Sequence, residues 1–233
     1  MLASRLLLSP LRLAIVVPTL NEQCVLARTL PAALAAADEV VVSDGGSGDG
    51  TVAVAQRLGA RVVCGPPGRG GQLNRGAAAA RADVLLFLHA DTELPSGAAD
   101  AVRRAIAQGA TGGGFLLRFD DRRPLFRLGG RLINLRTRCV RLPLGDQAQF
   151  VSRAAFDALG GFRDWPILED LDFALRLRRT RRSVLIRRPV TTAARRFVEQ
   201  GTARTIATNW LIWLLFFLGI SPHRLARLYR HIR

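Results

Sequence analysis

The sequence predicts an α/β protein whose single domain is built on a mostly parallel, doubly wound sheet with flanking helices. Short apolar runs alternate with stretches of helical patterning through the first half of the chain, and this order calls for parallel strands joined by helices. Two of the runs, 39–43 and 84–88, are largely apolar without alternation, so we expect them to be covered on both faces of the sheet. A chain of 233 residues is long enough to bury one such core.

The expected elements follow one another regularly up to about residue 110. We expect strands at 13–17, 39–43, 60–64 and 84–88. Helices should run from the turn 18–22 toward Ala37 and over 51–58, 72–81 and 96–108. Beyond residue 110 the pattern is less regular, with strands at 112–119 and 150–152 and helices at 127–140, 153–159 and 169–178. No repeat and no long linker interrupts the chain, so the second half is expected to complete the same domain.

The formal net charge of +16 comes from 34 basic and 18 acidic residues, and nearly all of the basic residues are arginine. Such a charge indicates partners rather than fold, and it fits nucleic acid, anionic lipid or simply an arginine-rich composition. The abundance of Ala, Arg and Gly favours composition as a large part of the cause. Nucleic-acid binding would need aromatic side chains for stacking, but Tyr229 is the only tyrosine and the tryptophans lie mostly in the apolar tail. We therefore expect no nucleic-acid partner.

The cysteines Cys24, Cys64 and Cys139 are widely spaced and form no CxxC pair, which argues against a zinc site or a disulfide framework. This usage is typical of the reducing cytoplasm. We interpret 13–17 as the first core strand and not as part of a signal peptide, because the sequence before it has no convincing small-residue cleavage site. The expected location is therefore cytoplasmic.

The C-terminal tail, residues 201–233, is expected to be helical, first apolar and then basic. Its run WLIWLLFFL at 210–218 is shorter than the roughly 20 residues that a spanning helix needs. One interpretation is a buried helix that closes the core. The other, slightly favoured because the run is apolar on all faces, is an interfacial helix that holds residues 206–233 on anionic lipid. In that case the protein is peripheral on the inner face of the cytoplasmic membrane.

Two carboxylates, Asp44 and Asp91, stand at the C-terminal ends of predicted strands. A lone Asp in this position is most often a turn former or a helix cap. Two of them at one edge of a sheet, where ligands of open α/β sheets bind, favour a nucleotide site. Asp44 suits the base or ribose, and Asp91 suits a divalent ion on a diphosphate. His89 is either a second metal ligand or merely a polar residue at the strand end.

Two further segments belong to the same edge of the sheet. The turn 18–22 would line the base and ribose pocket, and the glycine-rich loop 65–71 brings backbone freedom and the cation of Arg69, with Asn74 just beyond it. This loop could cradle phosphate, although it lacks the GxxxxGK[ST] pattern. No GxGxxG lies at the first turn, which counts against a dinucleotide-binding dehydrogenase.

The pair Glu169-Asp170 precedes a predicted helix in an otherwise basic half of the chain. Acidic residues there could simply compensate the helix dipole. A general base that deprotonates an acceptor hydroxyl is the functional alternative. Gly145-Asp146-Gln147 is another small polar segment, which alone indicates little.

These segments together resemble the family 2 inverting glycosyltransferases, whose fold is the nucleotide-diphospho-sugar transferase (GT-A) fold. The likeness runs from about residue 13 to 197. It rests on the order and spacing of PTLNE (18–22), DGGSGDGT (44–51), LHADT (88–92), GDQ (145–147) and LED (168–170). The WPILEDLD segment and the C-terminal stretch also resemble a bacterial subgroup associated with arsenosugar biosynthesis clusters.

The resemblance implies transfer of a sugar from a nucleotide-diphospho-sugar donor to an acceptor hydroxyl, on a small molecule or a lipid-linked acceptor. A nucleotide-binding half would cover about 13–110 and an acceptor half about 111–200. Carried over to this chain, the resemblance implies donor contacts from Pro18, Thr19, Glu22 and Asp44, a Mn²⁺ or Mg²⁺ ligand in Asp91, acceptor contacts from Asp146 and Gln147, and the catalytic base Asp170. To these the residues themselves add Arg69 and Asn74 as donor contacts, His89 as a candidate second metal ligand and Glu169 on the acceptor side.

Two departures from the family pattern bear on this expectation. His89 stands where many relatives carry the first Asp of a DxD motif, and no clear QxxRW motif is present, so processive synthesis is not expected. The alternative function is a membrane-associated scaffold in which the transferase fold has lost catalysis.

Overall fold

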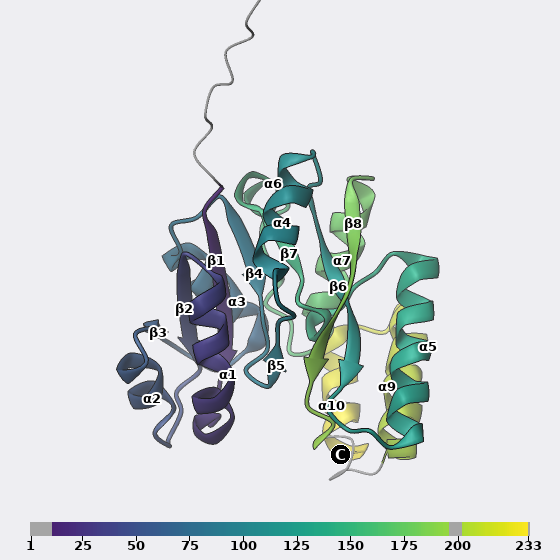
Figure 1. Cartoon of the computed structure of the whole chain (residues 1–233). Coiled ribbons are helices and arrows are strands. Elements are labelled where there is room, and N and C mark those ends of the chain that lie inside the picture. Colours follow the sequence, from purple (N-terminus) through teal and green to yellow (C-terminus); the bar gives the residue numbers. More distant parts are fainter. Residues whose placement is uncertain (1–10, 196–201, 233) are drawn as a thin grey trace, which may run out of the picture.

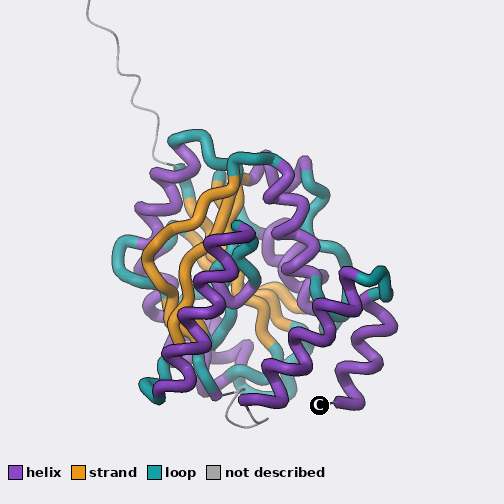
Figure 2. The backbone as a smooth tube through the Cα atoms, turned by 90° about the vertical axis from the view of Figure 1, so that its right-hand side faces the viewer, coloured by secondary structure: helices purple, strands orange, loops and turns teal. Residues whose placement is uncertain are grey.

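A computed structural model describes residues 11–195 and 202–232. Eight strands form one sheet in the order β3-β2-β1-β4-β7-β6-β8-β5, with helices on both faces (Figures 1 and 2). One buried cluster packs the α1 and α4 side chains Leu26, Leu30 and Val102 on one face of the sheet. A second cluster packs Leu73 and Phe173 on the other face. The chain is therefore an α/β domain, as expected.

The first half confirms the predicted alternation of parallel strands and helices. Its strands are β1 (Leu13–Thr19), β2 (Glu39–Asp44), β3 (Arg61–Cys64) and β4 (Val84–Phe87), and the pairs β1–β2, β1–β4 and β2–β3 are all parallel. Its helices are α1 (Gln23–Ala36), α2 (Thr51–Arg57), α3 (Arg69–Ala79) and α4 (Ala98–Ala107). Helix α3 begins within the glycine-rich loop, three residues before the predicted start at 72.

The second half corrects the expectation of a mostly parallel sheet. Strand β7 (Phe150–Ser152) lies between β4 and β6 (Gly112–Phe119) and is antiparallel to both. The sheet also contains β8 (Ser183–Thr192), parallel to β6, and the two-residue β5 (Thr92–Glu93), antiparallel to β8. The sheet is therefore mixed, and its last four strands do not follow the doubly wound order.

Between these strands lie α5 (Pro124–Val140), the 3-10 turn η1 (Gly145–Gln147), α6 (Arg153–Ala158) and α7 (Glu169–Arg179). Glycines in β6 let this part of the chain pack tightly. A Cβ at Gly113 would lie 1.9 Å from the Val184 carbonyl oxygen, and one at Gly114 would lie 2.4 Å from the Pro143 ring. The absence of side chains there allows the 143–147 segment to rest directly on the sheet.

The apolar tail forms α9 (Thr202–Phe217), followed after a turn at Gly219 (φ 89°) by α10 (Pro222–Ile232). Ile212 of α9 is buried, whereas Trp210 and Phe217 are about 60% exposed (63% and 59%). Within the described residues, no helix has the length and apolar character needed to cross a membrane. The tail thus buries one side and leaves apolar side chains open on the other.

Candidate active site

The turn after β1 and the loop after β2 are joined by hydrogen bonds into one unit. The Asn21 N–H donates to Ser47 Oγ (2.8 Å), and the Gly48 N–H donates back to Asn21 Oδ1 (2.9 Å). The Gly50 N–H donates to Gln23 Oε1 (2.9 Å). Asn21 has φ 55°, a left-handed conformation that Asn tolerates better than most residues. The motifs PTLNE and DGGSGDGT therefore form a single structure at the C-terminal edge of the sheet.

Asp44 is the centre of this unit. Its buried carboxylate accepts hydrogen bonds from Thr19 Oγ1 (3.0 Å), from the Gly46 N–H (2.9 Å), and from both the N–H and the hydroxyl of Ser47 (2.8 and 2.6 Å). Burial by itself would raise the pKa of Asp44, but these hydrogen bonds outweigh it and lower the pKa below its ordinary value. Asp44 is therefore held ionised, and its protein partners already use its lone pairs.

The other predicted donor residues of this edge lie beside Asp44. Pro18 is half-buried at the end of β1, and the Glu22 N–H donates to Thr51 Oγ1 (2.9 Å). Gln72, which the sequence did not single out as a site residue, ties the two strand ends together. Its Nε2 donates to the carbonyl oxygens of Thr19 (2.8 Å) and Ser43 (3.0 Å). A polar side chain beside two glycines was the only local signal for this role.

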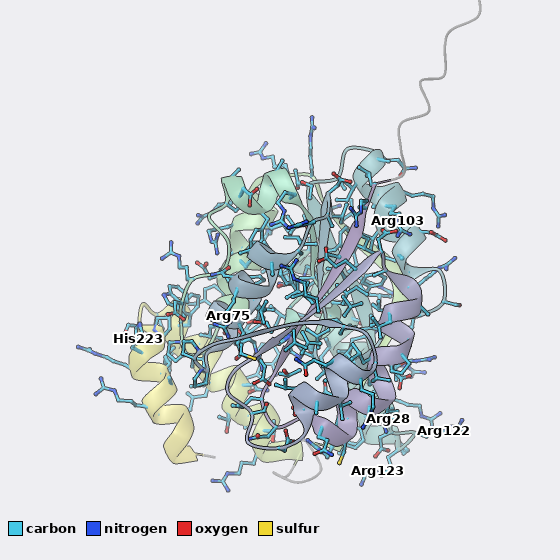
Figure 3. The ribbon with its side chains drawn as sticks, turned by 90° about the vertical axis from the view of Figure 1, so that its left-hand side faces the viewer. Arg28, Arg75, Arg103, Arg122, Arg123 and His223 are labelled. Atoms are coloured by element: carbon cyan, nitrogen blue, oxygen red, sulfur yellow. The ribbon has the colours of Figure 1, made fainter. Side chains whose placement is uncertain are left out.

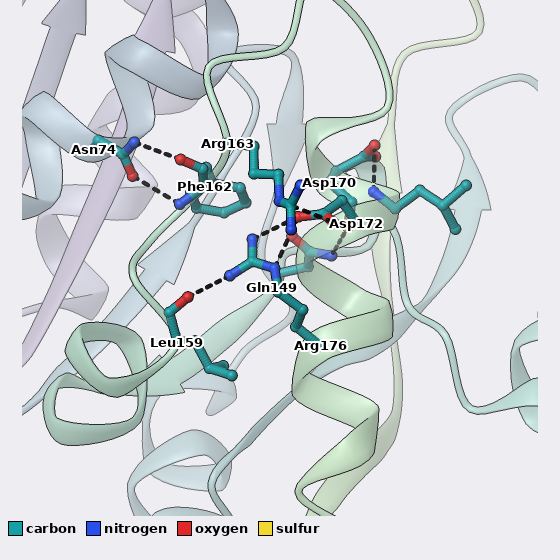
Figure 4. Close-up of polar contacts among 9 residues, drawn as sticks. Asn74, Gln149, Leu159, Phe162, Arg163, Asp170, Asp172 and Arg176 are labelled. Carbon is teal, nitrogen blue, oxygen red and sulfur yellow. Dashed lines mark hydrogen bonds and ion pairs between the residues drawn. The ribbon is translucent and has the colours of Figure 1, made fainter. Parts of the chain in front are cut away.

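The predicted donor contact Asn74 is bonded to the backbone of a distant segment of the chain. Its side-chain amide is paired with the backbone of Phe162, donating to the Phe162 carbonyl (2.7 Å) and accepting from the Phe162 N–H (2.8 Å), as Figure 4 shows. Both ends of the amide are thereby used to fix the loop before α7. The structure thus gives the Asn74 amide a structural contact.

Four carboxylates converge around Arg69, at the start of α3. The charges of Glu169, Asp170, Asp91 and Asp146 all act on its guanidinium, which lies 3.6 Å (Nε to Oε1) from Glu169. Burial would lower the pKa of Arg69, but these carboxylates raise it instead. The structure therefore brings together the predicted metal ligand, the predicted base and two predicted acceptor residues around one predicted donor residue.

A close backbone contact positions Arg69. A Cβ at Gly70 would lie 2.3 Å from the Arg163 carbonyl oxygen, so only glycine lets the start of α3 approach the 163–164 segment this closely. The 163–164 segment leads in turn to Glu169 and Asp170 at the start of α7.

Glu169 and Asp146 are the two carboxyl groups of the site whose pKa values are raised. Burial, with the neighbouring charge of Asp170, raises the pKa of Glu169 to about 7, although Arg69 opposes the shift. Burial also raises the pKa of Asp146 to about 6, against the opposing charge of Arg136. The buried oxygens Glu169 Oε1 and Asp146 Oδ1 have no hydrogen-bond partner within the described part of the chain. Glu169 Oε1 has only the longer ion pair with Arg69 Nε (3.6 Å), and Asp146 Oδ1 can accept a ligand's donor or a cation.

Asp170, the predicted base, is held in place by backbone groups. Its Oδ2 accepts from the Gly145 N–H and its Oδ1 from the Leu171 N–H, each at 2.8 Å. A Cβ at Gly145 would lie 3.0 Å from His89 Nε2 and 3.1 Å from Asp170 Oδ2. Gly145 therefore lies between the imidazole after β4 and the carboxylate of α7, and its missing side chain keeps this space open.

Gln147, a predicted acceptor residue, is completely buried and internally bonded. Its Nε2 donates to the Phe115 carbonyl (2.9 Å), and its Oε1 accepts from Thr137 Oγ1 (3.0 Å) and from Arg136 (3.2 Å). Arg136 was not identified as a site residue from the sequence. Its guanidinium lies over the Trp213 ring of α9, 4.9 Å from the ring centroid. Burial lowers the pKa of Arg136, although the charges of Asp146 and Asp170 oppose this shift.

Asp172 belongs to a supporting network and not to the cluster. Its carboxylate pairs with Arg176 (2.7 Å) and Arg163 (3.4 Å), and Arg176 also donates to the Leu159 carbonyl (2.6 Å), as Figure 4 shows. These contacts fasten the first turn of α7 to the preceding loop and thereby fix the orientation of Asp170.

The donor set fits a divalent cation that is shared with a substrate. Among the described residues, no three His, Cys, Asp or Glu side chains are close enough to hold a metal ion by themselves. Mg²⁺ and similar ions are often held by one or two carboxylates together with phosphate oxygens, so this finding agrees with a ligand-completed site. Four carboxylates face two guanidinium groups, and two buried carboxylate oxygens among the described residues accept no hydrogen bond, which favours an additional positive charge.

Comparison with known proteins identifies the family of the chain. The model of the family described as Glycosyl transferase family 2 matches residues 14–159. The chain belongs to glycosyl transferase family 2. The match includes the joined turns, Arg69, Asp91 and Asp146, whereas Glu169 and Asp170 lie beyond it. No curated protein sequence matches the chain.

Three solved structures show the same fold. The chain is similar to TarS 1–349 of S. aureus (18% identity, TM-score 0.62, 84% of this chain and 64% of that one). It is also similar to the mannosyltransferase PcManGT from Pyrobaculum calidifontis (19% identity, TM-score 0.54, 78% and 56%). The third is glucosyl-3-phosphoglycerate synthase from Mycobacterium tuberculosis (23% identity, TM-score 0.53, 78% and 70%). The chain thus spans less than two thirds of the first two proteins, and these likenesses show the GT-A fold alone.

Proposed function

We propose that this family 2 protein transfers a sugar, with inversion, from a nucleotide-diphospho-sugar to an acceptor hydroxyl, and that it needs Mn²⁺ or Mg²⁺. The observation that carries the proposal is the convergence of Asp91, Asp146, Glu169 and Asp170 on Arg69, beside the joined turns after β1 and β2. Such a site would provide a carboxylate ligand for a cation, a guanidinium group that can bind phosphate, and an oriented carboxylate that can accept a proton.

The nucleoside of the donor would lie against the joined turns. Pro18, Thr19 and Glu22 border that surface, and Asp44 holds its shape through four hydrogen bonds. Arg69 would face the diphosphate. Asp91, with His89 as a second candidate, would hold the divalent ion, which when bound neutralises the charge that develops on the departing nucleoside diphosphate.

Asp170 would accept the proton of the attacking hydroxyl. The Gly145 and Leu171 N–H groups, each 2.8 Å from one of its oxygens, fix its orientation. A single displacement at the anomeric carbon, with the acceptor oxygen entering opposite the departing diphosphate, inverts the configuration there. Glu169 and Asp146, whose pKa values are raised, are suited to share protons with the acceptor or the leaving group near neutral pH.

The neighbours suggest which donors to try first. TarS was solved with UDP-GlcNAc, the Pyrobaculum mannosyltransferase with GDP-Man and Mn²⁺, and the mycobacterial synthase with UDP and Mn²⁺. A panel of uridine and guanosine diphosphates and their sugars therefore covers the donor chemistry of these folds. The arsenosugar pathway remains a prediction that depends on the acceptor.

Calorimetric titration of this panel, with and without Mn²⁺, tests the proposal. Wild type should bind one nucleoside diphosphate in a metal-dependent manner, and Asp91→Ala should lose that dependence. Asp170→Asn should keep donor binding but lose transfer, whereas Asp157→Asn, an exposed acid of α6, should behave as wild type. Near-normal turnover by Asp170→Asn would show that the base is wrongly assigned. Absence of binding to every donor would favour the degenerate scaffold.

A further inference from the structure

Two helices, α5 and α9 of the C-terminal tail, expose rows of apolar side chains. On α5, Leu125, Leu128, Leu132 and Leu135 are each more than half exposed (54%, 54%, 56% and 59%). Their spacing of three and four residues places them on one side of the helix, opposite the buried Phe126 and Thr137. We call these four leucines the α5 stripe.

Helix α9 has a comparable exposed side. Trp210 (63%), Leu211 (42%), Leu214 (58%) and Phe217 (59%) are open, with Leu218 (70%) just beyond the helix, whereas Thr205, Thr208 and Ile212 on the other side are buried. The contact between Arg136 and Trp213 joins α9 to α5, and Figure 1 shows the two helices together at one end of the molecule. We call the α5 stripe and these five residues the apolar face.

Arginines are numerous in the segments that carry this face, and Asp121, directly before them, pairs with Arg123 (2.6 Å). Residues 122–145 contain seven arginines and no Asp or Glu, and residues 202–232 contain no acidic residue either. At about 100° per residue, Arg127, Arg131 and Arg138 form a row along one flank of the α5 stripe. All three are exposed. Figure 3 shows Arg122 and Arg123, which directly precede α5, at one side of the molecule and His223 of α10 at the other.

The α5 stripe ends at a basic cavity. One turn beyond Leu135, Cys139 lines a cavity of about 800 Å³ together with Arg141, Arg178 and Arg181. None of these three arginines forms an ion pair with a carboxylate among the described residues. The cavity lies at the C-terminal end of α7, roughly 15 Å along that helix from Glu169, so it is separate from the carboxylate cluster.

From these contacts we infer that the apolar face docks on an anionic lipid bilayer, with the arginine row and the basic cavity among the lipid phosphates. Exposed Leu, Trp and Phe flanked by Arg are suited to the boundary between headgroups and acyl chains. A second copy of the chain is a poorer occupant, because pairing two such faces would bring like charges together. The proposed docking surface is larger than the C-terminal tail, because four of its nine apolar residues belong to α5.

The docked orientation also bears on the active site. Arg136 contacts Trp213 of α9 and lies within the field of Asp146 and Asp170, so the apolar face adjoins the acceptor side of the carboxylate cluster. Provided that the proposed transferase function is correct, the acceptor hydroxyl would reach Asp170 from the membrane side.

Sedimentation of the full chain with vesicles tests docking without any substrate, so its result is independent of donor binding and transfer. The probes are vesicles of phosphatidylcholine alone and vesicles in which roughly three tenths of the lipid is phosphatidylglycerol. Wild type should bind the anionic vesicles strongly and the neutral ones weakly. Leu132→Ser should weaken binding about tenfold, whereas Val184→Ser, at an exposed apolar residue of β8, should not change it.

The arginine row is tested against arginines elsewhere. Arg127→Gln with Arg131→Gln should weaken binding about 25-fold, which corresponds to about fivefold for each charge near anionic lipid. Arg57→Gln with Arg104→Gln, which removes the same charge from exposed positions on α2 and α4, should change it little. Equal losses for the two pairs, or no effect of Leu132→Ser, would overturn the inference. A dimer in light scattering that Leu132→Ser dissolves would assign the face to a second copy instead.

Discussion

Replacement of Glu169 by Gln should remove most of the pH dependence of stability that arises in the carboxylate cluster. Glu169 is 2% exposed, and burial together with the charge of Asp170 raises its pKa to about 7. In the unfolded chain the same group titrates near 4.5. Between these two values the folded state binds more protons than the unfolded state, so the free energy of unfolding falls as pH rises.

The size of the effect follows from the two pKa values. A change from 4.5 to about 7 corresponds to about 3.5 kcal/mol at about 1.4 kcal/mol per pKa unit. Most of this lies between pH 5 and pH 8, so wild type should lose about 2–3 kcal/mol over that range through Glu169 alone. Asp146, whose pKa is raised to about 6, adds a loss of the same sign at lower pH. Glu169→Gln should therefore be more stable than wild type at pH 8.

Urea denaturation at pH 5 and pH 8, with EDTA present so that no divalent ion neutralises the cluster, measures this difference. Asp157→Asn serves as the control, because this exposed acid of α6 lies outside the cluster. If the stability of Glu169→Gln fell with pH as steeply as that of wild type, the buried charge would not be the cause, and the electrostatic account of the site would be refuted.

Further substitutions test the contacts that build the site. Gly70→Ala should lower the free energy of unfolding by about 1–3 kcal/mol in urea denaturation, because its Cβ would meet the Arg163 carbonyl; Gly71→Ala, with its nearest neighbour at 3.6 Å, should cost little. Gln72→Leu removes the Nε2 donor from two strand-end carbonyls, of which that of Thr19 keeps the Gly45 N–H as a partner, so both stability, by about 1–3 kcal/mol, and donor affinity in calorimetry should fall. Asn74→Ala should lower the thermal midpoint but leave donor affinity unchanged; a large loss of affinity at full stability would instead restore Asn74 as a donor contact.

The first half of the fold could be predicted because its information is local. Apolar runs such as 84–88 are long enough to identify a strand. A helix follows each strand and returns the chain to the edge of the sheet where that strand began, so the next strand runs parallel to it. Strand β8 could not be found in this way, since Arg187, Arg188 and Pro189 interrupt it and much of it is half-exposed. The direction of the three-residue β7 is decided by its partners β4 and β6, and nothing in its own sequence indicates it.

The candidate site was predictable to a similar extent. Asp91 and Asp170 stand out as carboxylates at the ends of apolar segments, and both lie in the cluster around Arg69. Arg136 is one of many arginines on a basic helix, so no local pattern separates it from its neighbours. Asn74 and Gln147 attracted attention as amides near glycines, but amides serve equally well to bond buried backbone, and the structure uses both in that way.

The hydrogen bonds between Asn21, Ser47, Gly48 and Gly50 have a consequence for the thermodynamics of recognition. Loops of this length would ordinarily lose conformational entropy when they close on a ligand, at roughly 1–2 kcal/mol for each residue that becomes fixed. Here the two turns are preorganised before any nucleotide arrives, so little of the binding free energy is consumed in ordering them. Binding at this edge should accordingly resemble rigid-body association, with a heat-capacity change set by the surface that is buried and with no contribution from coupled folding.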